Sequence, residues 1–223
     1  MSRVTVAIDG PAGAGKSTVA RELASRLGYA YLDSGAMYRC VALSGLELGK
    51  RLDSPQEMGT IAEAIRIDFQ PGTPQRVLLN GNDVTDRIRD ADVSVGASLV
   101  SVHPAVRRAM VARQRALGAG GGVVMEGRDI GTVVFPDAEM KVFLTASSTE
   151  RARRRTEESH ARGNHETDYD SVLRAIEERD HRDRTRADSP LVRADDAVEV
   201  VTDGLTPQEI VALLAGWVAG KEA

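Results

Sequence analysis

The sequence predicts an α/β fold: a parallel β-sheet flanked by helices, with a small antiparallel β insertion and a short helical lid. Three observations support this fold class. Short apolar runs alternate with helical patterns along most of the chain, as in sheets built from strand–helix units. The first apolar run leads into a glycine-rich loop that opens a helix. An Asn-Gly pair at 80–81 lies between short apolar stretches and indicates a hairpin.

The glycine-rich loop fits the pattern Gly-x-x-x-x-Gly-Lys-[Ser/Thr] in full. Its glycines allow backbone N–H groups to surround phosphate oxygens, and the N-terminus of the following helix also favours an anion. We expect Lys16 to reach the β- and γ-phosphates of a nucleoside triphosphate and the Ser17 hydroxyl to ligate Mg²⁺. A glycine-rich turn without a ligand is the alternative. The predicted triphosphate-binding residues are Gly10, Pro11, Ala12, Gly13, Ala14, Gly15, Lys16, Ser17 and Thr18.

The first half of the chain continues with strands, helices and the insertion. Val4–Ile8 predicts a strand buried on both faces, and the helix after the loop should end at Gly28. Ser54-Pro55-Gln56-Glu57 is a capping box for a further helix. The remaining predictions are a strand at 29–32, a helix from about 34 in which Ser34 is either a cap or a ligand, a β insertion at 67–100 and a helix from 104.

The second half repeats the alternation. Apolar runs predict strands at 123–125, 140–144 and 197–201, and capping signals predict helices beginning near 148, 168 and 207. In an open parallel sheet, ligands bind beyond the carboxyl ends of the strands. The charged residues of 126–129, at the end of one strand, are therefore candidate site residues. An ion pair that closes a turn is the alternative.

The segment 150–186 is rich in arginine, with ten Arg against ten Asp and Glu. Arg151, Arg154 and Arg155 share one helical face, and Arg179, Arg182, Asp183 and Arg186 form a stripe at helical spacing. Such arginines could neutralise a transferred phosphoryl group if 151–166 is a lid that closes over the loop and excludes water. A salt-bridged pair of solvated helices is the alternative.

Composition limits the remaining possibilities. At 223 residues, 42% of them hydrophobic, the chain has the size of one domain spanning 1–223 with one or two insertions. The single cysteine, Cys40, allows no intrachain disulfide and is expected to be buried on a helix. We find no membrane-length apolar run, signal-peptide pattern or histidine arrangement typical of a metal site. A net charge of −4 argues against a nucleic-acid partner, and we expect a cytoplasmic protein.

Four motifs, in order, resemble those of the bacterial cytidylate kinase family: 9–16 (DGPAGAGK), 33–39 (DSGAMYR), 127–138 (GRDIGTVVFPDA) and 178–184 (ERDHRDR). The resemblance implies a nucleoside monophosphate kinase fold of the P-loop type. It implies transfer of the γ-phosphoryl group of Mg-ATP to CMP or dCMP, with 67–100 in the acceptor-binding part. We expect a monomer. One departure is that this family often has Gly after the loop lysine, where this chain has Ser17.

The resemblance also implies roles for individual residues. Lys16, Arg128 and Arg179 would be catalytic, and the lid arginines Arg151, Arg154 and Arg155 would contact ATP. Ser98, Arg107 and Asp129 would read the cytosine. The acceptor phosphate and ribose would be held by Ser34, Arg39, Arg107, Arg128, Arg179, Asp183 and Arg186. The open alternatives are a kinase for another small acceptor, such as another nucleoside monophosphate or shikimate, and a P-loop switch protein, although the guanine-reading Asn-Lys-x-Asp is not found.

Overall fold

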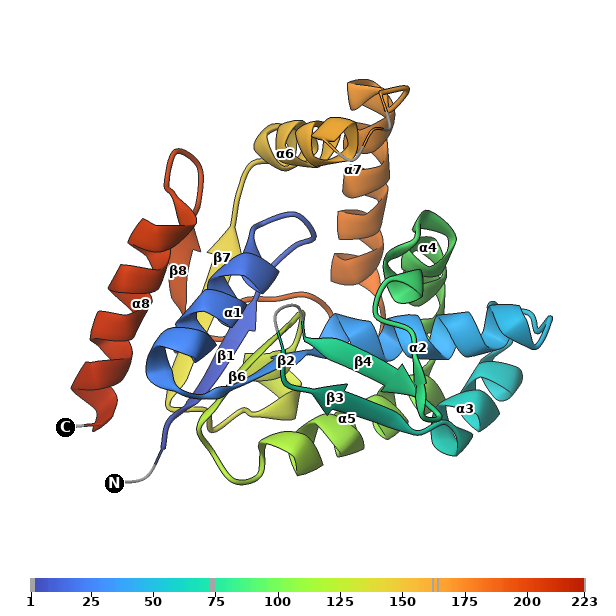
Figure 1. Cartoon of the computed structure of the whole chain (residues 1–223), viewed down its shortest axis with the longest axis horizontal. Coiled ribbons are helices and arrows are strands. Elements are labelled where there is room, and N and C mark those ends of the chain that lie inside the picture. The colour runs from blue at the N-terminus through green and yellow to red at the C-terminus, as the bar shows by residue number, and fades with distance from the viewer. Residues whose placement is uncertain (1–2, 73–74, 162, 164, 223) are drawn as a thin grey trace. The chain divides into compact units, whose positions relative to one another are not determined.

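The computed structural model describes residues 3–72, 75–161, 163 and 165–222. The chain forms two compact units (Figure 1). Unit 1 contains the residues up to Tyr31 and those from Gly120 onward, and unit 2 contains Leu32–Ala119. No helix among the described residues is both long and apolar enough to span a membrane.

Unit 1 contains most of a five-stranded sheet with the order β2-β6-β1-β7-β8, in which the last two residues of β2 belong to unit 2. The pairings of β1 with β6 and β7, and of β7 with β8, are parallel, which confirms the predicted sheet. In the register of β1 and β6, Ile8 lies beside Glu126 and Asp9 beside Gly127, so both strands end at the same edge. The strands are β1 (Thr5–Asp9), β2 (Ala30–Asp33), β6 (Val123–Gly127), β7 (Met140–Thr145) and β8 (Val198–Val201).

The helices of unit 1 begin and end where short-range signals predict. Helix α1 (Lys16–Leu27) ends at Gly28 in the left-handed conformation, and α6 (Ser148–Ala161) begins after Ser147, whose Oγ accepts from the Glu150 N–H at 3.2 Å. Asp168 caps α7 (Tyr169–Thr185). The capping box of Thr206 and Glu209 opens α8 (Pro207–Glu222), which lies beside α1 (Figure 1).

The core of unit 1 lies between the sheet and the helices α1 and α8. Val6 and Ile8 of β1 pack in one cluster with Leu23 of α1 and Leu214 of α8, and all four side chains are buried. This cluster anchors β1 and α1 on both sides of the glycine-rich loop, so the loop is held at both ends by buried apolar contacts.

Unit 2 contains four helices and a small sheet among its described residues. The helices are α2 (Ser34–Glu47), α3 (Pro55–Ala64), α4 (Ala91–Val100) and α5 (Pro104–Gly118). The strands β3 (Ile67–Gln70), β4 (Arg76–Leu79) and β5 (Asn82–Asp83) form an antiparallel sheet, as predicted. Asn80 and Gly81 both have positive φ in the β4–β5 turn, which explains the Asn-Gly pair.

Two predicted segments do not match the structure in full. The stretch 67–100 is β only as far as Asp83 and then continues as a 3-10 turn (Arg87–Arg89) and α4. The predicted lid, 151–166, contains most of α6, but positions 162 and 164 lie outside the described residues. Positions 73 and 74 of the predicted insertion also lie outside them. The roles of 67–100 as an acceptor-binding part and of 151–166 as a lid stay predictions.

Cys40 is fully buried on α2, as expected. Burial raises the pKa of its thiol to about 12, so the thiolate is scarce at neutral pH. Cys40 is therefore a small apolar residue of the core of unit 2.

Candidate active site

The glycine-rich loop follows β1 and requires glycine at specific positions. Gly10, Gly13 and Gly15 all have positive φ. A Cβ atom at Gly10 would lie 1.9 Å from the Leu144 carbonyl oxygen of the neighbouring strand, so no other residue fits there without displacing the backbone. The loop thus runs close to the end of β7 before it enters α1.

Lys16, the first residue of α1, is buried beneath the loop and is only 5% exposed. Its Nζ donates to the Pro11 carbonyl at 2.7 Å. Burial, with help from the nearby positive charges of Arg128 and Arg179, lowers the pKa of Lys16 to about 7. Cations held this close together are stabilised by an anion, which is what a triphosphate would supply.

Two buried carboxyl groups lie where β1 and β6 end. Asp9 accepts hydrogen bonds from the backbone N–H groups of Ile130 (2.8 Å) and Gly131 (2.7 Å), at the start of the π-helical turn Ile130–Val134. Burial raises the pKa of Asp9 to about 6. The Glu126 carboxylate accepts from the Tyr31 hydroxyl at 2.6 Å.

Sequence reasoning gave no role to Asp9. The available signal was its place at the carboxyl end of the first strand, immediately before Gly10. Its carboxyl holds the turn that follows Arg128 and Asp129, so it joins the phosphate loop to that pair of candidate residues.

Arg128 and Asp183 form an ion pair in unit 1. Arg128 donates from Nε to the Asp183 carboxylate at 2.9 Å, and its Nη1 donates to the Gly127 carbonyl. Burial would raise the pKa of Asp183, but the positive charges of Arg128 and Arg179 hold that pKa below its usual value. Arg128, Arg179 and Asp183, three of the predicted residues, are therefore close enough to interact strongly.

Arg186 and Asp129 complete this group. Helix α7 ends at Thr185 and Arg186 is its C-cap, so only the first three residues of the predicted stripe are helical. Its Nε donates to the Ser189 carbonyl at 2.7 Å, and another of its nitrogens lies 3.7 Å from an Asp129 carboxylate oxygen. Unit 1 thus brings together Lys16, Arg128, Asp129, Arg179, Asp183 and Arg186.

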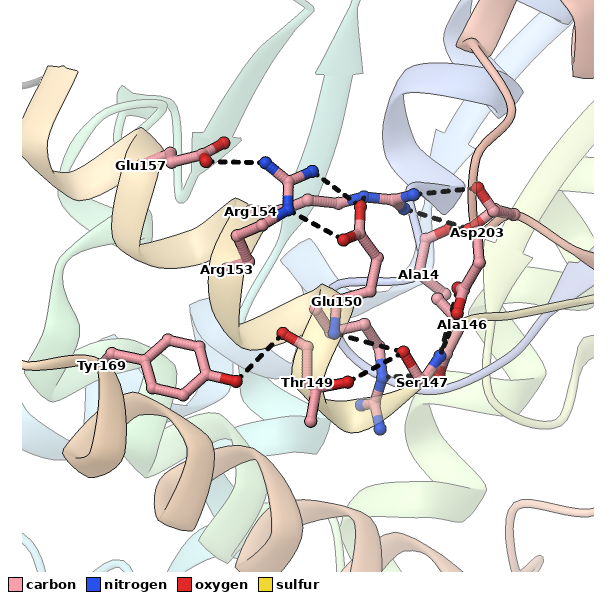
Figure 2. Close-up of polar contacts among 12 residues, drawn as sticks. Ala14, Ala146, Ser147, Thr149, Glu150, Arg153, Arg154, Glu157, Tyr169 and Asp203 are labelled. Atoms are coloured by element: carbon pink, nitrogen blue, oxygen red, sulfur yellow. Dashed lines mark hydrogen bonds and ion pairs between the residues drawn. The ribbon is translucent and has the colours of Figure 1, made fainter.

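Of the three lid arginines, Arg151 and Arg154 are engaged by protein groups. Figure 2 shows the Arg154 side chain beside Glu150. Every guanidinium nitrogen of Arg151 donates, to the carbonyls of Ala146 and Ala12 and to the Asp180 carboxylate. Arg154 donates to Glu150 and to both the side chain and the carbonyl of Thr202. Arg155 is exposed.

The candidate residues of unit 2 fall into two groups. In the first, Arg39 donates to Asp33 at 2.5 Å, and Asp33 caps α2 by accepting from the Ala36 N–H. The cap is therefore Asp33 and not Ser34, because the residue that precedes the first helical position accepts from the N–H three residues later. Ser34 is the first residue of α2 and is buried.

The second group is centred on Arg107, a residue of α5 that is 2% exposed. Its guanidinium lies over the Tyr38 ring, 5.9 Å from the centroid, and donates to the Ser101 carbonyl at 3.4 Å. The Ser101 hydroxyl in turn donates to the Ser98 carbonyl. Ser98 and Arg107 are therefore linked through one intervening residue.

A Mg²⁺ ion would find one protein ligand at the loop. Ser17 is exposed in the first turn of α1, beside the phosphate loop. Across the described part of the chain there is no group of three or more His, Cys, Asp or Glu placed to hold a metal. The exposed Ser17 hydroxyl fits Mg²⁺, which is commonly bound by few protein ligands together with substrate phosphates and water.

A family model and the curated relatives described below indicate the same family. A family model described as Cytidylate kinase matches residues 6–219. The chain is 49% identical over 213 residues to a cytidylate kinase of Limosilactobacillus fermentum, covering 96% of this chain and 94% of that protein. It is 53% identical over 209 residues to a cytidylate kinase of Solibacter usitatus, covering 93% and 89%. A solved shikimate kinase from Bacteroides thetaiotaomicron matches with a TM-score of 0.50, 13% identity and coverage of 97% and 98%, which is a likeness of fold alone.

Proposed function

This chain belongs to the cytidylate kinase family, and on that premise we propose that it transfers the γ-phosphoryl group of ATP to CMP or dCMP. The products are ADP and CDP or dCDP. The observation that carries the proposal is the gathering of Lys16, Arg128 and Arg179 in unit 1, where burial and the two nearby arginines lower the pKa of the lysine.

This arrangement suits phosphoryl transfer. The transferred group passes through a transition state whose charge is spread over its oxygens, so positioning and charge neutralisation supply most of the catalysis. Lys16 would neutralise the β- and γ-phosphates, and Arg128 and Arg179 would neutralise the acceptor phosphate and the transferred group. The acceptor phosphate is already an anion, so the reaction needs no general base. Asp183 holds Arg128 in place through the 2.9 Å ion pair.

The loop and the first turn of α1 would bind the donor. The backbone N–H groups that Gly10–Thr18 offers, which exclude Pro11, would surround the phosphates of ATP, and Ser17 would provide the protein ligand of Mg²⁺. When bound, Mg²⁺ neutralises charge on the β- and γ-phosphate oxygens. Of the arginines proposed to contact ATP, Arg155 is exposed, whereas Arg151 and Arg154 are engaged by protein groups.

The acceptor nucleotide would be bound by the residues that the resemblance assigns to it. We assign its phosphate and ribose to Ser34, Arg39, Arg107, Arg128, Arg179, Asp183 and Arg186, and its base to Ser98, Arg107 and Asp129. Support comes from the burial of Ser98 and Arg107, because a buried polar side chain discriminates strongly between ligands that satisfy it and ligands that do not. We further propose that the protein acts in the cytoplasm as a monomer without a nucleic-acid or membrane partner.

The experiment that tests this function measures ADP release from Mg-ATP with CMP, dCMP, UMP, AMP, GMP, shikimate or no acceptor. We expect rapid turnover with CMP and dCMP and slow turnover with the others. If AMP or shikimate is the better acceptor, the assigned base-reading residues are wrong. If no acceptor exceeds the blank, the kinase proposal itself fails.

A further inference from the structure

The phosphate loop is held from outside by side chains of α6 and of the turn after β8. Arg151 of α6 donates to the Ala12 carbonyl at 3.0 Å. The Thr202 hydroxyl donates to the Ala14 carbonyl at 3.4 Å. Arg154, one turn along α6, donates to the Thr202 hydroxyl at 3.0 Å and to the Thr202 carbonyl at 2.9 Å.

These bonds determine the direction of the loop's N–H groups. A trans peptide unit is planar, and its C=O and N–H point in opposite directions. Holding the Ala12 carbonyl toward Arg151 therefore points the Gly13 N–H away from α6. In the same way, holding the Ala14 carbonyl toward Thr202 sets the direction of the Gly15 N–H. Both peptide units adjoin glycines with positive φ, which have more accessible backbone conformations than other residues and need such restraint.

Arg151 is itself oriented by Asp180 of α7. The two side chains form a bidentate ion pair, with N–O distances of 2.6 and 3.1 Å, and both are almost completely buried. A planar guanidinium that is held by two parallel bonds has a defined orientation. Its remaining N–H groups then reach Ala12 and Ala146. Asp180 lies between Arg179 and Asp183 on α7, so this pair connects the helix that carries the acceptor arginine to the donor loop.

We propose that Asp180 and Thr202 are positioning residues for ATP: each holds a loop carbonyl outward, Asp180 through Arg151 and Thr202 directly. The loop N–H groups are thereby oriented toward the phosphates before ATP binds, and Arg151 acts through the loop and not as a phosphate ligand. This inference rests on the proposed function only for the identity of the nucleotide.

The test compares Asp180→Asn and Thr202→Val with wild type in the full chain. Thr202→Val keeps the shape of the side chain and the carbonyl that Arg154 uses. Glu157→Gln is the matched control, because Glu157 forms an exposed ion pair with Arg153 on the same helix and touches no loop residue that the structure describes. Two quantities are measured: the dissociation constant of the imido analogue of ATP, and the amide resonances of Gly13 and Gly15 without nucleotide.

Each variant should weaken binding of the analogue about tenfold. The reason is that a loop N–H that points in the wrong direction loses roughly one hydrogen bond to a charged phosphate oxygen. The KM for CMP should stay within about twofold of wild type, since that ligand does not use the loop. The Gly13 resonance should shift in Asp180→Asn and the Gly15 resonance in Thr202→Val, whereas Glu157→Gln should change neither. Arg151→Lys and the double variant Asp180→Asn, Arg151→Lys extend the test. The double variant should lose less affinity for the analogue than the sum of the losses in the two single variants, because both changes break the same connection from Asp180 through Arg151 to the Ala12 carbonyl.

Unchanged analogue binding in variants that fold would overturn the inference. Tighter binding by Asp180→Asn would also overturn it, because the released Arg151 would then be a direct phosphate ligand. If Asp180→Asn fails to fold, Thr202→Val and the Gly15 resonance decide the question alone. A wild-type protein that binds the analogue but does not phosphorylate CMP would refute the proposed function and leave this comparison intact.

Discussion

Arg128 donates from Nε to the Asp183 carboxylate at 2.9 Å, and this ion pair joins the turn after β6 to the last part of α7. Arg128 is 18% exposed at its side chain, whereas Asp183 is 6% exposed. The guanidinium is therefore anchored on one side and accessible on the other. An anchored cation of this kind can neutralise a phosphate without a large loss of side-chain entropy.

We expect Arg128→Ala to lower kcat by about 10²–10³-fold, the usual effect of removing one preorganised donor to a transition state. Steady-state kinetics with ATP and CMP measures the change. Arg193→Ala is the control, because Arg193 forms an exposed ion pair with Glu199 and has no assigned role. An unchanged kcat/KM for CMP would remove Arg128 from the site.

Ser98 should control the choice of base. Ser98→Ala removes a buried hydroxyl, and we expect the KM for CMP to rise about tenfold while the KM for ATP is unchanged. The ratio of kcat/KM for CMP to that for UMP should fall. Ser94→Ala, one turn earlier on α4, is the matched control. A Ser98→Ala enzyme that keeps the wild-type ratio would show that this side chain does not read the base.

Ser17 should affect the metal requirement. Ser17→Ala removes the proposed protein ligand, so the Mg²⁺ concentration for half-maximal activity should rise about tenfold at fixed ATP. Titration of activity with MgCl₂ measures this shift, and Ser25→Ala, an exposed serine of α1, should leave it unchanged. An unaltered Mg²⁺ titration in Ser17→Ala would mean that the hydroxyl does not contact the metal.

Asp9 should titrate near pH 6, since burial raises its pKa from 3.8 to about 6. The folded pKa lies above the unfolded one, so the stability that this carboxyl contributes is complete below pH 3.8 and is lost as the pH rises through 6. Relative to Asp9→Asn, the free energy of unfolding should fall by about 2 kcal/mol between pH 4 and pH 7. Denaturant unfolding across this range checks the stability difference.

Two charged neighbours of Asp9 shift its pKa in opposite directions, which provides a control. The Lys16 cation lowers the pKa of Asp9 and the Asp129 anion raises it. Titration of the ¹³C-labelled Asp9 carboxyl should therefore move to higher pH in Lys16→Met and to lower pH in Asp129→Asn. A wild-type titration near pH 4 would contradict the assigned burial.

Gly10→Ala should destabilise the fold strongly. Its Cβ would meet the Leu144 carbonyl oxygen at 1.9 Å, and the backbone is at φ 145°, so we expect a loss above about 3 kcal/mol in the free energy of unfolding. Gly28→Ala is the matched control, because Gly28 has φ 65° and no atom within 4 Å of the added Cβ. That change should cost about 1 kcal/mol. Equal losses in the two variants would show that the clash at Gly10 is relieved.

The sequence by itself determined the elements whose signals are local. The glycine-rich loop, the αL cap at Gly28, the Asn80-Gly81 hairpin, the N-cap at Ser147 and the capping box at Thr206 each depend on residues within about eight positions of one another. These signals predicted the order of strands and helices and the place of the phosphate loop. The four motifs that resemble one enzyme family predicted the family.

Only the tertiary structure decided which partners the charged side chains take. Arg151 and the Ala12 carbonyl are 139 positions apart, and Asp9 and Ile130 are 121 apart. The sheet order, which places β6 and β7 on either side of β1, brings such groups together, and no local pattern encodes it. Burial then requires each of these groups to have a partner, because a guanidinium or carboxylate removed from water must be paired. For that reason the sequence predicted only that Arg151 lies on one face of a helix. The folded structure shows that its guanidinium donates to the Ala12 carbonyl of the phosphate loop.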